Sequence, residues 1–209
     1  MSEKITLWTR QDQRFLDVIK KEKVFYSKKE YIEEKHDTLS AYYLPLYDWF
    51  VEEAEKRVKR PPGAQYPIWC SISDAYMLRG AQGNVLIKLS VDKERVLYFN
   101  SGKWDLVLNH TYIPKDDKDQ ENFSKELKDL GIKNSFSFMG DYYQKFYPGL
   151  VKKVKDSWQR IFDVDLEHSD IFSIQANIWE IRPEDILLIT EYEEENTAPS
   201  IMSLSDYYK

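Results

Sequence analysis

The sequence predicts an α+β fold with a small mixed sheet, mainly antiparallel, flanked by helices. Two kinds of periodicity indicate this class: some short runs alternate apolar and polar residues, and other runs repeat apolar residues at helical spacing. Their order is a strand, then helices, then several strands with one helical insertion, unlike the repeating β-α-β pattern of a parallel sheet. With 209 residues in total, we expect a single domain over residues 1–192.

The first half of the chain is expected to hold two strands and two helices. Alternation with a period of two predicts strands over residues 4–10 and 66–73. Helical spacing of apolar residues predicts helices over residues 11–21 and 40–60, the second ended by a pair of prolines. In the second strand the alternation places Cys70 on the apolar side.

The second half is expected to hold a β-hairpin and a final pair of strands. Residues 85–91 and 95–100 are strand-like and separated by a short charged turn, which is typical of a hairpin. Residues 172–181 and 186–192 form either a second hairpin or two sequential strands. The other predicted elements are a helical turn over 104–108, a surface helix that follows a charged loop from 114 and ends near 131, and a helix over 152–162. Residues 193–209 are predicted to be a tail, flexible or docked.

Composition limits the classes of protein that the chain can belong to. The formal net charge is −6 and the isoelectric point is about 5.3, so the whole chain lacks the basic field of a non-specific nucleic-acid binder. A single cysteine cannot form an intramolecular disulfide, and the charged N-terminal residues do not resemble a signal peptide. The apolar runs are far shorter than the roughly 20 residues that span a bilayer. We therefore expect a cytoplasmic protein without a membrane segment.

Several common catalytic motifs are missing from the sequence. His36, His110 and His168 are far apart and match no zinc-binding spacing, so no metal site is expected. The seven glycines form neither a phosphate-binding loop nor a dinucleotide fingerprint. These absences argue against kinases, GTPases and Rossmann dehydrogenases. Cys70, on the apolar side of its strand, is expected to be an inert buried thiol rather than a nucleophile.

Three predicted strands carry polar and aromatic side chains at positions that do not resemble ordinary surface decoration. In the strand over 172–181, Gln175 and Asn177 project to one side, whereas Glu180 follows the apolar side. An acid at the end of an apolar face is either solvated at the rim or functional. The candidate residues on the three strands are Trp8, Thr9 and Arg10; Trp69 and Ser71; and Gln175, Asn177 and Glu180.

Short segments of the chain resemble known proteins. The segments LWTRQ at 7–11, YPIW at 66–69, residues 104–109 and QANIWEI from 175 resemble a bacterial family known only as a domain of unknown function. The arrangement of strands also resembles the ADP-ribosyltransferase superfamily, which includes toxins and phage-defence enzymes that modify nucleic acid. This second resemblance implies an ADP-ribosyltransferase-like fold and NAD as a substrate, with no metal.

The superfamily resemblance also implies roles for individual residues. Its first strand supplies an Arg or His to NAD, its second a Ser or Tyr, and a late strand an acid. The cofactor-binding positions would be Trp8, Thr9, Arg10, Trp69 and Ser71, and the catalytic positions Glu180, Gln175 and Asn177. Cleavage of the glycosidic bond of NAD develops positive charge on the ribose, which a carboxylate stabilises. The superfamily's acid aligns with Gln175 or Asn177, so the nearest acid here, Glu180, is displaced.

Two functional hypotheses follow. The first is an NAD-dependent ADP-ribosyltransferase, a toxin or phage-defence effector, that modifies a macromolecular acceptor (protein or nucleic acid) and has an antitoxin or inhibitor protein as a further partner. The alternative is a non-catalytic protein-interaction module that uses the same aromatic cleft. Each residue also has an ordinary interpretation: Arg10 as a surface cation, the tryptophans as packing against a helix, and Glu180 as a turn ion pair with Arg182.

Overall fold

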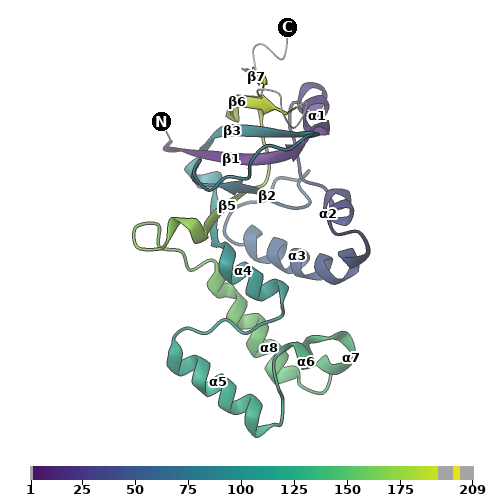
Figure 1. Ribbon diagram of the computed structural model, residues 1–209, viewed down its shortest axis with the longest axis vertical. Helices are drawn as coiled ribbons and strands as arrows, with labels where there is room; N and C mark the ends of the chain where they lie inside the picture. Colours follow the sequence, from purple (N-terminus) through teal and green to yellow (C-terminus); the bar gives the residue numbers. More distant parts are fainter. Residues whose placement is uncertain (1, 193–199, 203–209) are drawn as a thin grey trace. The chain divides into compact units, whose positions relative to one another are not determined.

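The computed structural model describes residues 2–192 and 200–202 and confirms the α+β class (Figure 1). The strands are β1 (Lys4–Asp12), β2 (Ile68–Ser71), β3 (Asn84–Asp92), β4 (Leu97–Asn100), β5 (Ile174–Ile178), β6 (Ile186–Glu191) and β7 (Ser200–Met202). The helices are α1 (Arg14–Glu22), α2 (Lys29–His36), α3 (Ser40–Glu55), α4 (Ser101–Leu108), α5 (Asp117–Asp129), α6 (Phe136–Met139), α7 (Asp141–Gln144) and α8 (Pro148–Ser157). Contacts group the chain into two compact units, residues 1–98 with 170–209 and residues 99–169, and each is described by itself.

The strands form one sheet in the order β4-β5-β2-β1-β3-β6-β7. The described pairings of β1, β2, β3, β5, β6 and β7 are all antiparallel. β1 and β3 pair over nine residues, from Lys4 opposite Asp92 to Asp12 opposite Asn84. This long ladder fixes which side chains of β1 face the core, because a slip of one residue would turn every side chain to the other face.

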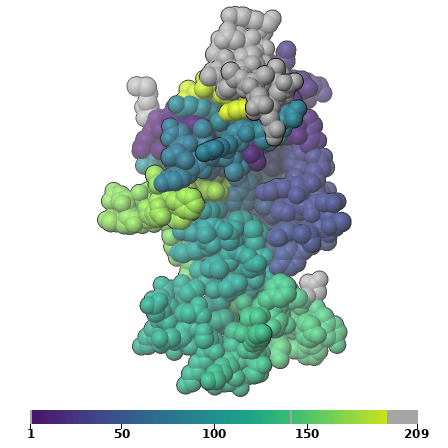
Figure 2. Space-filling view, in the orientation of Figure 1, coloured from purple at the N-terminus to yellow at the C-terminus, as the bar shows by residue number. Residues whose placement is uncertain are grey.

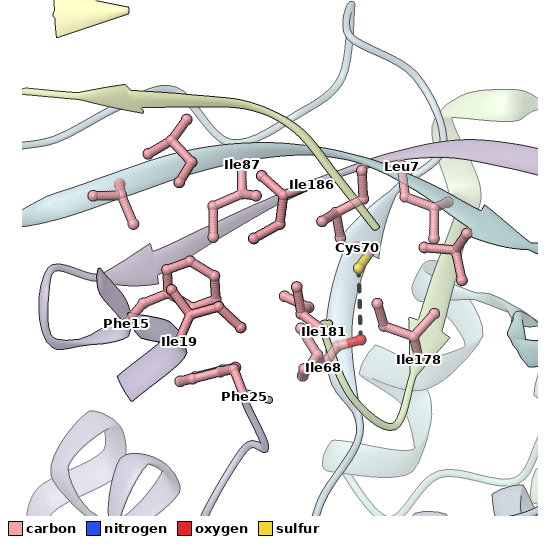
Figure 3. Packing of buried hydrophobic residues seen from close by; sticks show 14 of the residues in the cluster. Leu7, Phe15, Ile19, Phe25, Ile68, Cys70, Ile87, Ile178, Ile181 and Ile186 are labelled. Atoms are coloured by element: carbon pink, nitrogen blue, oxygen red, sulfur yellow. Dashed lines mark hydrogen bonds between the residues drawn. The ribbon is translucent and has the colours of Figure 1, made fainter. Parts of the chain in front are cut away.

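The core of the first unit lies between one face of the sheet and α1. Val85, Ile87, Leu89 and Val91 alternate along β3 and each has an exposed fraction of 0%. The helix adds a second apolar stripe, and Figure 3 shows side chains from the helix and the sheet packed together. The α1 residues in this cluster are Phe15, Leu16 and Ile19. Cys70 lies in the same cluster with an exposed fraction of 2%, which confirms its predicted place in the core.

The predicted hairpin over residues 85–100 is wrong. β3 and β4 follow one another in sequence, yet β4 lies beside β5 at one edge of the sheet, whereas β3 lies between β1 and β6. The two final strands also separate, because β5 lies between β4 and β2 and β6 between β3 and β7. Local patterns predict that a segment is a strand, but burial against distant segments selects its neighbours.

Two helices differ from their predicted limits. The first begins at Arg14 and not at residue 11, because β1 continues to Asp12 opposite β3. The long helix α3 ends at Glu55, five residues before the predicted end. Beyond it, the backbone N–H groups of both Arg57 and Val58 donate to the Ala54 carbonyl, which closes the helix before the prolines are reached.

Some elements escaped prediction. The segment of α2, KEYIEEKH, has only Ile32 buried and shows no apolar stripe, so its periodicity did not predict a helix. Most of the predicted tail, 193–209, lies outside the described residues, but Ser200–Met202 pair with β6 as β7.

The second unit is built from helices. Trp158, which has an exposed fraction of 1%, donates its indole N–H to the Thr111 carbonyl over 2.9 Å. Ser157 accepts the Ile113 backbone N–H over 2.9 Å. These bonds attach the end of α8 to the segment between α4 and α5. None of the helices in the described part of the chain has the length and apolar character that crossing a bilayer requires.

Candidate functional site

One row of predicted site residues crosses three neighbouring strands. Trp8 of β1 is the partner of Ser71 of β2, and Ser71 is the partner of Gln175 of β5. Partners in adjacent strands project to the same side of a sheet. An indole, a hydroxyl and an amide are thereby aligned on the sheet face opposite the one that packs against α1.

A second row lies two residues further along each strand. Trp69 is the partner of Asn177. Arg10 lies two residues from Trp8 in the direction of Trp69, because β1 and β2 are antiparallel. Side chains two residues apart in a strand share a face. Six of the eight predicted site residues, those of the two rows, therefore belong to one side of the sheet.

A cavity of about 540 Å³ opens where β1 and β2 separate. In the described register these strands share one partner pair, Trp8 with Ser71, although β1 and β3 pair over nine residues. The volume suits a small organic ligand. The predicted site residues that line this cavity are Trp8, Thr9, Arg10, Trp69, Ser71 and Gln175.

Helices α2 and α3 provide another wall of the cavity. Tyr31 and Lys35 of α2 and Tyr47 of α3 are among its lining residues. Trp69 lies edge-on to Tyr47, with ring centroids 5.9 Å apart, and also contacts Phe50 at 5.1 Å. In the space-filling view, the segment from α2 to α3 forms a continuous surface beside the strands (Figure 2).

The hydroxyl groups of the cavity differ in their remaining capacity. Thr9 donates to the Trp69 carbonyl over 2.9 Å and accepts from the Gln11 amide over 2.7 Å. It is buried and bridges β1 to β2. The Ser71 hydroxyl donates to the Ser73 carbonyl over 3.0 Å, so its lone pairs remain available to accept a hydrogen bond from a ligand.

Two acids at the cavity share a single arginine. Arg14 donates to Asp12 over 2.8 Å and to Glu34 over 2.6 Å. These hydrogen bonds hold the pKa of Asp12 and that of Glu34 below their ordinary values. Both carboxylates are therefore ionised and already paired at neutral pH, and neither is poised to act as a general acid.

Two cations lie at the cavity without an acidic partner among the described residues. Arg10 donates to the Arg79 carbonyl over 2.9 Å, which leaves its charge unbalanced. Partial removal from water, followed by the nearby charge of Arg10, lowers the pKa of Lys35. The cavity therefore favours an anionic group beside Arg10 and Lys35.

Asn177 and Glu180 do not line the cavity. Asn177 has an exposed fraction of 2%; its amide N–H donates to the Ile68 carbonyl over 3.4 Å, and its side-chain oxygen has no partner among the described residues. Glu180, with an exposed fraction of 6%, accepts a hydrogen bond from Arg182 over 2.8 Å. The ordinary interpretation of Glu180 as an ion-pair partner of Arg182 is therefore confirmed.

Two further titratable groups at the cavity are held neutral. Removal from water raises the pKa of Tyr47 to about 12. Burial likewise raises the pKa of the Cys70 thiol to about 12. Neither group is ionised near neutral pH. The described residues also contain no group of three or more histidine, cysteine or acidic side chains placed to hold a metal ion.

Sequence reasoning did not identify the α2 and α3 wall. Lys35 lies in a segment without periodicity, and Tyr47 belongs to a tyrosine cluster that looks like helix core. The feature that could have drawn attention to Lys35 is the charged run EEKH at residues 33–36, which carries a lysine next to two acids. Only the fold brings that run to β1 and identifies which of its charges faces the cavity.

Comparison with known families finds a match that covers most of the chain. The model of the family described as "Domain of unknown function (DUF3841)" matches residues 6–187. Comparison with curated proteins and with solved structures gives no significant match.

Proposed function

Since the chain belongs to the family Domain of unknown function (DUF3841), whose description names no reaction, we propose a function from the cavity itself: it binds NAD and transfers ADP-ribose to a macromolecular acceptor. One observation carries this proposal. The Trp8, Ser71 and Gln175 row, with Arg10 beside it, comes from three separate strands and borders a single cavity.

The groups at the cavity suit the parts of NAD. An indole, from Trp8 or Trp69, stacks on a flat aromatic ring such as nicotinamide. The guanidinium of Arg10 suits the negative pyrophosphate. Ser71 keeps lone pairs for a ribose hydroxyl, because its own proton is donated to Ser73.

The transfer step needs no metal ion. The bond between the ribose C1′ and the nicotinamide nitrogen breaks, and neutral nicotinamide leaves with the bonding electrons. A nucleophile of the acceptor, in a protein or a nucleic acid, forms the new bond to C1′ and releases its proton. Gln175 would stand beside the ribose, where its amide oxygen offers a partial negative charge in place of a full one. Because an amide stands where a carboxylate would stabilise the charge more strongly, the proposal predicts slow turnover.

Asn177 and Glu180 receive positioning roles in this proposal. Both are buried outside the cavity lining. Asn177 lies opposite Trp69, and its amide N–H donates to the Ile68 carbonyl. Glu180 accepts from Arg182 in the turn after β5. They would hold β5 so that Gln175 stays at the cavity.

The experiment is incubation of the purified protein with radiolabelled NAD and a cell extract. We expect nicotinamide release and label on a macromolecule, and sensitivity of that label to protease or nuclease identifies the acceptor class. Gln175→Ala should lower the rate at least about tenfold, whereas Gln175→Glu, which supplies a full charge, should raise it. Glu180→Gln keeps the shape of the side chain but loses the ion pair with Arg182 that positions β5, so it should lower the rate less than Gln175→Ala does.

A non-catalytic interaction module is the second candidate. The observation that favours it is that both acids lining the cavity, Asp12 and Glu34, are paired with Arg14, and that Glu180 is not among the lining residues. The first unit also exposes large aromatic side chains that a partner protein could cover. Tyr76 and Phe172 lie edge to face with centroids 5.3 Å apart and are 51% and 66% exposed. Absence of nicotinamide release by both the unaltered protein and Gln175→Glu would favour the module.

A further inference from the structure

Lys35 is a cation of the cavity that no strand motif predicts. It comes from α2, on the wall that faces β1, and it lines the same cavity as Arg10. Within the described part of the chain, its ammonium group has neither a hydrogen bond nor an ion pair. A lysine at a cavity is expected to find an acid if one is within reach, so the use of the nearby acids decides what Lys35 can bind.

The acids near Lys35 on α2 are engaged elsewhere. Glu34 is held by Arg14 through two hydrogen bonds, of 3.2 and 2.6 Å. Glu33 pairs with Lys29 at 3.1 Å. Asp12, the other acid of the cavity lining, also belongs to Arg14. Because these carboxylates are already paired, none of them is the ion-pair partner of Lys35.

Arg10 and Lys35 act on one another across the cavity. The charge of Arg10 lowers the pKa of Lys35, which places the two cations within electrostatic range. Like charges brought together without an anion are unfavourable, and an anion between them reverses this interaction. A guanidinium and an ammonium that line the same cavity can both donate hydrogen bonds to the oxygens of one phosphate group.

We propose that Lys35 and Arg10 together form a phosphate subsite, so that the cavity selects ligands that carry a phosphate or pyrophosphate group. The assignment of that group to the pyrophosphate of NAD rests on the proposed function. The subsite itself rests on the two unbalanced cations and the cavity that they share. A phosphate there contacts one element of the sheet and one helix, and thereby joins α2 to β1.

The test is calorimetric titration of the full chain with inorganic pyrophosphate, ADP and nicotinamide riboside. Nicotinamide riboside carries no phosphate group and serves as the ligand that should not use the subsite. Lys35→Gln should weaken ADP and pyrophosphate binding on the order of tenfold and leave nicotinamide riboside unchanged. Lys35→Arg should retain most of the affinity. Lys28→Gln, at the exposed N-cap of the same helix and outside this cavity lining, is the matched control and should bind as the unaltered chain does.

The outcomes separate the subsite from the transferase. Lys35-dependent binding of ADP by a protein that never releases nicotinamide would support the subsite and overturn only the transferase. ADP binding that is equal in Lys35→Gln and the unaltered chain would overturn the subsite, even if NAD is consumed. Equal weakening by Lys28→Gln, or no binding of pyrophosphate, would also overturn it. Lys35 is exposed, so each variant should fold normally.

Discussion

Arg95 and two acids near the turn after β5, Glu180 and Asp185, form a charged cluster in the first unit. Arg95 donates two hydrogen bonds to Asp185, of 2.6 and 2.9 Å, and a third to the Glu180 carbonyl over 3.2 Å. Asp185 is 1% exposed and also accepts the Arg182 backbone N–H over 2.9 Å. A buried carboxylate of this kind depends on its partner, because isolated burial of a charge is costly.

We predict that Arg95→Met lowers the free energy of unfolding by about 3–5 kcal/mol, because Asp185 would be left as an unpaired buried charge. Urea denaturation followed by circular dichroism measures this loss. Lys93→Met is the matched control: Lys93 lies two residues away and pairs with Glu3 at 2.9 Å, with both side chains exposed. Its loss should be below about 1 kcal/mol. Equal losses in the two variants would contradict the burial argument.

Cys70 offers a chemical probe of the core. Its thiol has a pKa raised to about 12 by burial and contacts the Ile68 carbonyl at 3.8 Å. We predict slow reaction with Ellman's reagent in native buffer at both about pH 7 and about pH 9, because the thiol is buried and its thiolate is scarce at any pH well below the raised pKa. Concentrated guanidinium should make labelling fast. Rapid labelling of the native protein would mean that reagent reaches Cys70 through the cavity, of which it is a lining residue, and would contradict its burial.

The site residues of the strands could be predicted from sequence because strand side chains alternate. Alternation placed Trp8 with Arg10 and Trp69 with Ser71, and the structure puts both pairs at the cavity. Lys35 could not be found in this way, since its helix has no apolar stripe. The pairing of Glu180 with Arg182 was foreseen only as an alternative, because sequence does not tell which charges are buried together.

At the scale of elements, α1 covers one face of the sheet. The helical spacing of its apolar residues predicted this helix from the sequence. Phe15 and Ile19 are one helical turn apart and have exposed fractions of 1% and 0%. Phe15 also meets Phe25 edge to face, with centroids 4.9 Å apart. Packing of this stripe, and not helix propensity, is expected to hold so short a helix in place.

We predict that Ile19→Ala lowers the free energy of unfolding by about 2–5 kcal/mol, because it leaves a void in a closely packed core. Ile19 does not line the cavity, so ligand affinity should change little. Asp17→Ala, on the exposed side of α1, should stay within about 0.5 kcal/mol of the unaltered chain. Urea denaturation of the three proteins tests this, and an Ile19→Ala protein as stable as Asp17→Ala would contradict the packing described.

At the scale of the whole molecule, strand order separates what sequence could predict from what it could not. The strands that were predicted are present, but the order β4-β5-β2-β1-β3-β6-β7 brings β2 next to β5 across more than 100 residues. That pairing creates the Ser71 and Gln175 neighbourhood on which the site depends. Periodicity is a local property, whereas the neighbours of a strand follow from the burial of the whole chain.

The structure of the protein crystallised with NAD tests the central claim most directly. The pyrophosphate is predicted within hydrogen-bonding distance of Arg10, with the nicotinamide ring stacked on Trp8 or Trp69 in the cavity that these residues line. A dinucleotide bound elsewhere on the chain, or a cavity that stays empty at saturating NAD, would contradict the account.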